Sequence, residues 1–292
     1  MIDLHVHTTN SDGTWTTKEM LEKAEKMGLE VFSITDHDTA KSYIEIEQNP
    51  ELKEIYKGKL IQGVELNCTY NGIKIEILAY GFDVKPIQNF LENYYTPEKN
   101  KMRLIEEFNE LVQLCKKNRI KIEDNLKYNP DCEYPVDVIY DSIVKCKENK
   151  KLFREKEWES KETFFRTCTI DKKFPLYRDF SKQMPTLEFF NKLIHKYNGK
   201  IFLAHLYKYK LDNYINLLDE ITKKNLVDGI EVYHSSFTKE QMEFLKLYCK
   251  DNNLLMSGGS DCHGERKKDR KLGTGYDNLN ISKDIIKNWH IY

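Results

Sequence analysis

Residues 1–36 read MIDLHVHTTNSDGTWTTKEMLEKAEKMGLEVFSITD, and this stretch decides the expected fold. Residues 2–7 alternate apolar and polar side chains, which is typical of a half-buried strand. Residues 16–30 then predict an amphipathic helix that ends at Gly28. The apolar face of this helix carries Met20, Leu21, Ala24 and Met27. Residues 30–38 predict a second strand, so the chain begins with a strand, a helix and a strand.

Five further stretches predict strands: residues 59–67, 72–83, 200–205, 227–234 and 253–261. Helical stretches are predicted around residues 186–198, 212–224 and 238–251. Such an alternation over most of a chain favours a parallel α/β barrel or a layered sheet. Functional side chains are then expected at the carboxyl ends of the strands.

The overall composition excludes several classes of protein. The chain has 292 residues, and 46 Lys and Arg against 47 Asp and Glu give a net charge of −1, so no global charge attracts it to nucleic acid or membrane. The apolar runs are too short to span a membrane, and the start lacks the pattern of a signal peptide, so a cytoplasmic location is expected. The seven cysteines are scattered without a C-x-x-C pair, which predicts reduced thiols.

The region from about residue 98 to residue 185 interrupts the alternation. It predicts a helix with apolar residues at Leu104, Phe108, Leu111, Val112 and Cys115. A highly charged stretch follows at residues 145–162. We therefore expect one catalytic domain over residues 1–292, interrupted by a mainly helical, solvated insertion or cap over the barrel mouth. The alternative is a basic face that grips the substrate.

Residues that bind metal ions in proteins stand at the predicted strand ends. They are His5, His7, Asp12, Asp36, His37, Asp38, Glu65, His205, Asp261 and His263. Residues two apart on a strand face the same side, so His5 and His7 can present their imidazoles to one point. Imidazole and carboxylate ligands without thiolate suit Mn²⁺, Fe²⁺ or Zn²⁺. The set exceeds what one ion can use, so we expect two or three ions that share bridging carboxylates, with Glu65 as the best bridge.

Five motifs resemble, in order and spacing, those of the polymerase and histidinol phosphatase (PHP) superfamily. They are DLHVHTTNSDGTWT from residue 3, ITDHDT from residue 34, GVEL from residue 63, LAH from residue 203 and GGSDCHG from residue 258. The resemblance covers residues 1–80 and 186–275. It is greatest to the stand-alone phosphoesterases, which include nucleoside 3′,5′-bisphosphate phosphatases and 5′–3′ exoribonucleases. It implies a distorted (β/α)₇ TIM-like barrel with up to three metal ions.

The resemblance also implies roles for single residues. His5, His7, Glu65 and Asp261 would hold the first ion, and Glu65 would bridge to a second ion held by His205. Asp12, His37 and His263 would hold a third. The chain departs from the family at Glu76, where a histidine is usual. A carboxylate there adds negative charge and shifts the metal preference toward Mn²⁺ or Mg²⁺ and away from Zn²⁺.

A second departure concerns phosphate binding. Relatives carry an R-x-H segment in the insertion, whereas the corresponding residues 132–143 (CEYPVDVIYDSI) contain neither Arg nor His. Phosphate recognition would then fall to Tyr207, Lys208 or Arg178. His234 ends a predicted strand on the functional face, where it can contact the substrate or make a structural hydrogen bond.

These residues predict a metal-dependent phosphoesterase. A metal-activated hydroxide would hydrolyse a phosphomonoester or phosphodiester of a small metabolite, a nucleotide or a short RNA end. One alternative is an amidohydrolase-type barrel, which also begins with H-x-H but typically uses a bridging Lys. A second is a non-catalytic PHP-like module that binds a partner or assists a polymerase, to which Glu76 and the missing Arg give weight. The sequence predicts neither a membrane contact nor an obligate protein partner.

Overall fold

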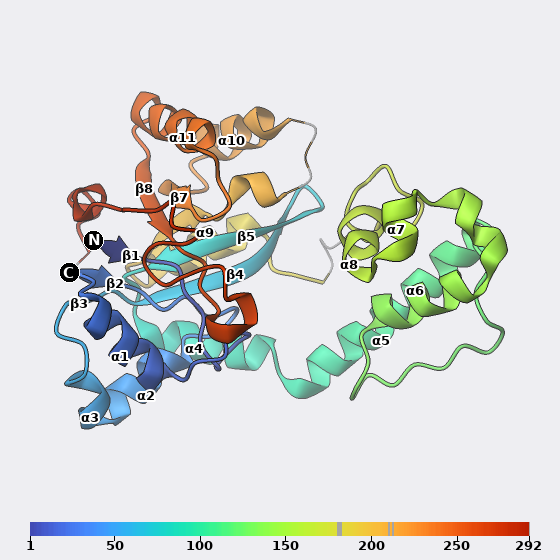
Figure 1. Cartoon of the computed structure of the whole chain (residues 1–292), viewed down its shortest axis with the longest axis horizontal. Coiled ribbons are helices and arrows are strands. Elements are labelled where there is room, and N and C mark those ends of the chain that lie inside the picture. The colour runs from blue at the N-terminus through green and yellow to red at the C-terminus, as the bar shows by residue number, and fades with distance from the viewer. Residues whose placement is uncertain (180–182, 210, 212, 292) are drawn as a thin grey trace. The chain divides into compact units, whose positions relative to one another are not determined.

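The N-terminal stretch folds into the predicted strand, helix and strand (Figure 1). In the computed structural model, which describes residues 1–179, 183–209, 211 and 213–291, these elements are β1 (Ile2–Asp3), α1 (Thr17–Met27) and β2 (Val31–Phe32). β1 and β2 are parallel neighbours, and β2 pairs in parallel with β3 (Lys59–Leu60). Two short helices, α2 (Lys41–Gln48) and α3 (Pro50–Lys53), lie between β2 and β3 in the chain.

The ends of α1 follow directly from its sequence. Thr16 and Glu19 form a capping box, and Gly28 ends the helix in the left-handed conformation, with φ at +69°. Met20, Leu21 and Ala24 are buried, as predicted. The prediction for Met27 is wrong: its side chain is 42% exposed, because it lies in the last turn and borders a pocket instead of the core.

Five longer strands form the second sheet, in the order β4-β5-β6-β7-β8. They are β4 (Gly63–Tyr70), β5 (Ile73–Tyr80), β6 (Lys200–Leu203), β7 (Gly229–His234) and β8 (Leu255–Gly259). β6, β7 and β8 are parallel, whereas β5 and β6 are antiparallel. The sheet is therefore mixed, and the predicted all-parallel alternation is wrong at β5.

The described strands form an α/β fold with two sheets, and their hydrogen bonds do not show a single closed barrel. The chain joins β4 and β5 through Asn71 and Gly72, both with positive φ. A two-residue turn of this kind reverses the chain without a crossover helix, so it departs from the (β/α) repeat. Three isolated parallel bridges occur among the described residues, and two of them, Val6 with Cys262 and His37 with Glu65, connect segments next to the first sheet with segments of the second.

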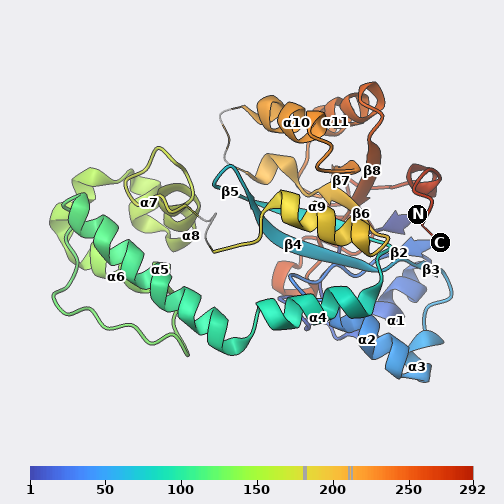
Figure 2. The same ribbon diagram turned by 180° about the vertical axis from the view of Figure 1, so that it is seen from behind.

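Four helices accompany the second sheet in the described chain: α4 (Val84–Tyr94), α9 (Leu187–Lys196), α10 (Tyr214–Lys223) and α11 (Lys239–Asp251). α9, α10 and α11 lie where the sequence predicted them, whereas α4 was not predicted. Residue 212, the start of one predicted stretch, lies outside the described residues. α9 packs against β4 and β6 (Figure 2), with Leu187, Phe190 and Ile194 buried. Three short 3₁₀ turns complete these segments: η4 (Leu206–Lys208), η5 (Gly264–Lys267) and η6 (Lys283–Ile286).

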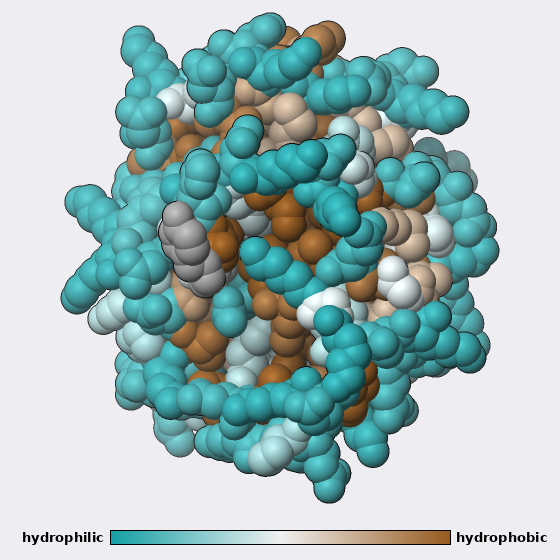
Figure 3. Space-filling model, turned by 90° about the vertical axis from the view of Figure 1, so that its left-hand side faces the viewer, coloured by the Kyte–Doolittle hydropathy of each residue, from teal (hydrophilic) through white to brown (hydrophobic). Residues whose placement is uncertain are grey.

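The described chain divides into two units. The sheet unit comprises residues 1–70, 75–93 and 184–292, and the helical unit comprises residues 71–74 and 94–183. The face of the sheet unit seen in Figure 3 carries hydrophilic side chains around a hydrophobic centre. Within the described ranges, no helix combines the length and the apolar character needed to cross a membrane.

The helical unit has a hydrophobic core of its own. Its elements are α5 (Pro97–Lys117), α6 (Pro135–Lys145), η1 (Lys147–Leu152), α7 (Glu155–Glu159), α8 (Lys161–Phe164) and the π-helix η2 (Phe165–Thr169). Phe108, Leu111 and Cys115 of α5 are buried as predicted, whereas Leu104 and Val112 are half-buried. Residues 180–182 of the predicted insertion lie outside the described residues. The helical unit is thus a packed body and more than a solvated insertion.

Candidate metal centre

Backbone hydrogen bonds join the segments that carry the predicted ligands. The N–H of Asp261 donates to the carbonyl of His5 over 2.8 Å, and the N–H of His7 donates to the carbonyl of Cys262 over 2.9 Å. The N–H of Asp38 donates to the carbonyl of Glu65 over 2.8 Å. Motifs that are far apart in the sequence are therefore held side by side, as strand ends in an α/β fold are expected to be.

Glu65 occupies the centre of the cluster and is buried. Its Oε2 lies 3.2 Å from Nε2 of His5, 3.3 Å from Nε2 of His7 and 3.2 Å from Nδ1 of His37. Its Oε1 lies 2.7 Å from Nε2 of His205. One carboxylate thus faces four imidazoles, which is the arrangement expected of a bridging ligand.

Asp261, Asp12 and His263 complete one side of the cluster. Oδ1 of Asp261 lies 3.3 Å from Nε2 of His7 and 3.7 Å from Nε2 of His5. Oδ1 of Asp12 lies 3.2 Å from Nε2 of His263 and 3.7 Å from Nδ1 of His7. Six side chains that the sequence singled out, namely His5, His7, Glu65, His205, Asp261 and His263, therefore come together in the structure.

Glu76 projects from β5 toward the same cluster. Its Oε2 lies 3.3 Å from Nε2 of His205, and its side chain is 23% exposed. The carboxylate also falls within metal-binding reach of His37 and Glu65. The structure thus places the unusual carboxylate at the position where the sequence predicted it.

The buried polar atoms of the cluster fit metal ions. Both ring nitrogens of His7, Nδ1 of His37, Nδ1 of His205 and Oδ1 of Asp12 are buried and lack a hydrogen bond within the described residues. Such atoms are costly unless they bind a ligand. Four sets of ligand atoms lie close enough to share an ion: His7, Asp12, His37 and His263; His5, His7 and Asp261; His5, Glu65 and His205; and His37, Glu65 and Glu76. The donors are all imidazole nitrogens and carboxylate oxygens, which suit Mn²⁺, Fe²⁺ or Zn²⁺.

Hydrogen bonds fix which nitrogen of two histidines is available to a metal ion. Nδ1 of His5 donates to Oε1 of Glu231 over 2.7 Å, so Nε2, which lies 3.2 Å from Oε2 of Glu65, is the nitrogen that can bind a metal ion once it loses its proton. Nδ1 of His263 lies 2.8 Å from the carbonyl oxygen of Asp261, so Nε2 faces Asp12. Partners of this kind orient ligands and raise their basicity.

Glu231 acts on two strand ends at once. Besides holding His5, its Oε2 accepts a hydrogen bond from the backbone N–H of His205 over 2.7 Å. Glu231 is fully buried. A carboxylate buried to this extent needs partners. The structure identifies His5 and His205 as the partners.

Asp38 supports the loop beside the cluster in a similar way. Its carboxylate accepts hydrogen bonds from the backbone N–H of Asn67 over 3.0 Å and from the side chain of Asn67 over 2.7 Å. Asp38 does not cap the following helix, because α2 begins after Ala40 without a side-chain cap.

The charges of the cluster shift the pKa values of its members in opposite directions. Burial alone would raise the pKa of Glu65, but His37 and His5 hold it well below its usual range. Burial opposes a charge on His7 as well, yet Asp261 and Glu65 raise its pKa to about 9. Burial lowers the pKa of His263 to about 4. The carboxylates therefore stay ionised. Their negative charge outweighs the effect of burial at His7 but not at His263.

Three residues of the site adopt backbone conformations that side chains rarely take. The φ angles are +52° at Asp38, +22° at His205 and +55° at Asp261. Each such residue costs on the order of 1–3 kcal/mol, so it persists only where the surrounding structure imposes it. Two of the three are predicted metal ligands, which indicates that ligand placement outweighs local stability here.

Two cations and a histidine surround the outer oxygen of Asp261. Nζ of Lys208 lies 2.9 Å from Oδ2, Nε2 of His234 lies 3.3 Å from it, and the guanidinium of Arg270 forms an ion pair with it. Arg266 pairs with Oδ2 of Asp12 over 3.0 Å. Sequence analysis named Lys208 and His234 but missed the two arginines. The basic run RKKDRK, directly after the D-x-H motif at residue 263, was the signal for them.

The other two candidates for phosphate binding lie elsewhere. Tyr207 packs edge-on against the rings of Tyr214 and Phe237, at centroid distances of 5.3 and 5.0 Å. Arg178 belongs to the helical unit and is 1% exposed. Its Nη1 lies 2.7 Å from Glu107, and its Nε lies 3.1 Å from Glu110. The guanidinium of Arg178 is therefore engaged in structural ion pairs.

The chain is similar to known proteins over most of its length. The PHP domain family model matches residues 3–289. A 5′-3′ exoribonuclease of Haemophilus influenzae is 24% identical over 283 residues, which cover 89% of each chain. A 5′-3′ exoribonuclease of Escherichia coli is 25% identical over 272 residues, which cover 89% of this chain and 84% of the relative. A protein of Bifidobacterium adolescentis, assigned as a metal-dependent phosphoesterase, shares the fold with a TM-score of 0.60 at 22% identity, over 98% of this chain and 93% of its own.

Proposed function

This chain belongs to the PHP domain family, and we propose that it is a metal-dependent phosphoesterase. The proposed substrate is a phosphomonoester or phosphodiester of a nucleotide, a short RNA end or a small phosphorylated metabolite. The observation that carries the proposal is the set of buried nitrogen and oxygen atoms around Glu65 that have no hydrogen bond. The two relatives named as 5′-3′ exoribonucleases support RNA as the first substrate to test.

We infer that two or three divalent ions bind at these atoms. His5, His7, Glu65 and Asp261 would hold the first ion, Glu65 with His205 and Glu76 the second, and Asp12, His37 and His263 the third. Glu76 favours Mn²⁺ over Zn²⁺, because a carboxylate is a harder ligand than imidazole. When bound, such ions activate water near neutral pH and neutralise charge on phosphate oxygens.

The side chains at the rim would position the phosphate. Lys208 keeps its proton, because burial alone would lower its pKa but Asp261 raises it. Burial lowers the pKa of His234 to about 4, so this imidazole is neutral at pH 7. The backbone N–H of Ser236 donates to Nδ1 of His234, which leaves the proton on Nε2, toward Asp261. Lys208, His234 and Arg270 thus offer three donors at one point, and these donors can reach phosphate oxygens there.

The proposal includes the arrangement of the chain. Two of the isolated bridges, Val6 with Cys262 and His37 with Glu65, support a distorted (β/α)₇ barrel assembled from both sheets. The segment from about residue 98 to residue 185 would be an insertion within one catalytic domain spanning residues 1–292. The proposed location is the cytoplasm.

Phosphate release from adenosine 3′,5′-bisphosphate and from a 5′-phosphorylated hexauridylate, each with Mn²⁺, tests the proposal. We expect EDTA to abolish release, and His7→Ala to reduce it more than about 100-fold, since even changes behind a metal ligand cost 10–100-fold. His195→Ala is the matched control, because His195 is an exposed histidine of the sheet unit that pairs with Asp228 over 2.8 Å. Equal release by wild type and His7→Ala, or release that persists in EDTA, would refute the proposal.

A further inference from the structure

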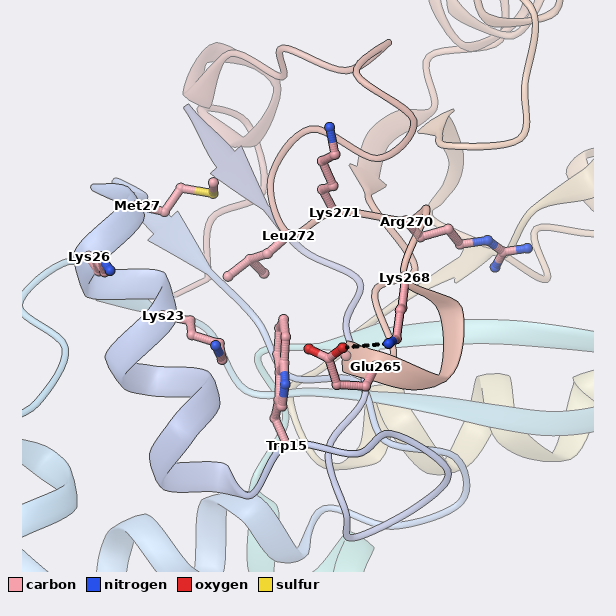
Figure 4. A pocket seen from close by; sticks show the side chains of 10 residues that line it. Trp15, Lys23, Lys26, Met27, Glu265, Lys268, Arg270, Lys271 and Leu272 are labelled. Carbon is pink, nitrogen blue, oxygen red and sulfur yellow. Dashed lines mark ion pairs between the residues drawn. The ribbon is translucent and has the colours of Figure 1, made fainter.

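A pocket of about 440 Å³ lies between α1 and the segment of residues 264–272 (Figure 4). Its volume is within the range of small-molecule sites in proteins. Half of the ten residues that line it are basic: Lys23, Lys26, Lys268, Arg270 and Lys271. Glu265 is the only acidic residue among the ten. The chain as a whole has a net charge of −1, so the positive charge is local to this pocket.

An aromatic ring forms one wall of the pocket. Trp15 is half-buried, and Nζ of Lys23 lies 4.1 Å from the ring centroid. On the other side the ring approaches Gly264, where a Cβ atom would lie only 3.0 Å from it. Figure 4 shows Trp15 between Lys23 and Glu265. Gly264 therefore fixes the indole, and the face toward Lys23 borders the pocket.

The pocket adjoins the candidate metal centre. Arg270 lines the pocket, yet its guanidinium forms an ion pair with Asp261. Gly264 follows His263 directly, and the carbonyl oxygen of His263 accepts a hydrogen bond from the N–H of Thr14, next to Trp15. Arg270 therefore borders both the pocket and the metal centre, and its side chain points away from Trp15 and Lys23 (Figure 4).

The basic side chains of the pocket differ in how far they are neutralised. Lys268 pairs with Glu265 over 3.5 Å, and Lys271 pairs with Asp277 over 2.5 Å. Lys23 and Lys26 form no ion pair within the described part of the chain. The α1 side of the pocket therefore keeps positive charge available to an anionic ligand.

We propose that this pocket binds the nucleotide next to the scissile phosphodiester of a single-stranded RNA. The base takes the place of Lys23 over the ring of Trp15, and the backbone phosphate lies among Lys23, Lys26 and Lys268. An aromatic ring combined with basic residues is how proteins bind single strands without reading their sequence. This inference rests on the proposed phosphoesterase function and names the class of substrate for that site.

Binding of RNA in EDTA tests the pocket without turnover. Wild-type protein is titrated with 5′-phosphorylated hexauridylate labelled at its 3′ end and, in parallel, with an abasic hexamer of the same charge. We expect the base-containing RNA to bind about tenfold more tightly than the abasic one, and Trp15→Ala to remove that difference. Lys26→Glu should weaken both ligands about equally, because it removes a phosphate contact.

The control for Lys26→Glu is Lys250→Glu, which makes the same charge change at an exposed lysine of α11. The proposal for the pocket would be overturned if Trp15→Ala and wild type bound the base-containing RNA equally, or if wild type did not bind RNA. Hydrolysis of adenosine 3′,5′-bisphosphate with Mn²⁺ separates the two proposals. If RNA binding depends on Trp15 but no hydrolysis occurs, the proposed phosphoesterase function is refuted and the proposed RNA pocket is supported. If hydrolysis occurs but Trp15→Ala binds RNA as tightly as wild type, the RNA pocket is refuted and the phosphoesterase function is supported.

Discussion

The sheet unit and the helical unit treat buried charge in opposite ways. In the helical unit, Arg178 is buried but its guanidinium pairs with Glu107 and Glu110. In the sheet unit, His7 is equally buried, and neither of its ring nitrogens has a hydrogen bond within the described residues. The guanidinium of Arg178 has ion-pair partners of its own, which is typical of a structural element, whereas the ring nitrogens of His7 face three carboxylates that other imidazoles share, which is typical of a metal site. The way in which buried polar groups are paired therefore indicates the functional site more directly than their burial alone.

Metal removal should produce the largest difference in stability between the two units. If ions bind at the cluster, Mn²⁺ at 1,000 times its dissociation constant adds about 4 kcal/mol to the stability of the folded sheet unit. EDTA should therefore speed amide hydrogen exchange around His5, His7 and Asp261, and leave α5 and α6 unchanged. Hydrogen exchange with mass spectrometry measures both. Equal changes in the two units would mean that the metal acts on the whole chain and not on this site.

Leu111→Ala tests whether the core of the helical unit is independent of the metal centre. Leu111 is fully buried in the core of the helical unit, beside Phe108 and Ile139. Its truncation should destabilise that unit by about 3 kcal/mol, since Leu→Ala in a core costs 2–5 kcal/mol. Mn²⁺ affinity, measured by calorimetry on the folded protein, should stay within about twofold of wild type. Leu245→Ala, at an equally buried position on α11 of the sheet unit, is the matched comparison.

Glu231→Gln should have a smaller but more specific effect. The change keeps the shape of the side chain and removes the charge behind His5, so Mn²⁺ affinity should fall about 10–100-fold. Burial lowers the pKa of His5, and Glu231 and Glu65 raise it well above its ordinary value. Without the charge of Glu231 this pKa falls, so protons compete with Mn²⁺ only at lower pH.

The pH at which Mn²⁺ binding is half-maximal should consequently be lower in Glu231→Gln than in wild type. The Mn²⁺ affinity at high pH should be reduced. A residue that merely packs would lower the affinity and leave the midpoint unchanged. Ser257→Ala is a control, because it alters another fully buried polar side chain, on β8.

Much of the candidate site could be predicted because its ligands follow strands. The alternation around His5 and His7, and the spacing of Asp261 and His263, determine which side of the chain they face. Strand ends of an α/β fold meet at one edge, so a linear list of such residues predicts a cluster. Glu76 could be placed only through the resemblance to the PHP family, because it lies within β5 and not at a strand end.

Other features depend on pairings that one sequence does not reveal. The antiparallel pairing of β5 with β6 arises from the turn at Asn71 and Gly72, and a strand pattern looks the same in either direction. Glu231 becomes the partner of His5 only when residues 226 positions apart meet. Arg178 appeared suitable for phosphate, and only its three-dimensional contacts with Glu107 and Glu110 showed that it is engaged.

The central position of Glu65 has a consequence for any attempt to count ions. Its two oxygens face four imidazoles, which in the proposed centre belong to more than one ion. Ions that share a ligand do not load independently, because the first one to bind changes both the charge and the geometry offered to the next. A titration of this protein would then report the occupancy of an assembly, and the separate affinities of its sites would have no individual meaning.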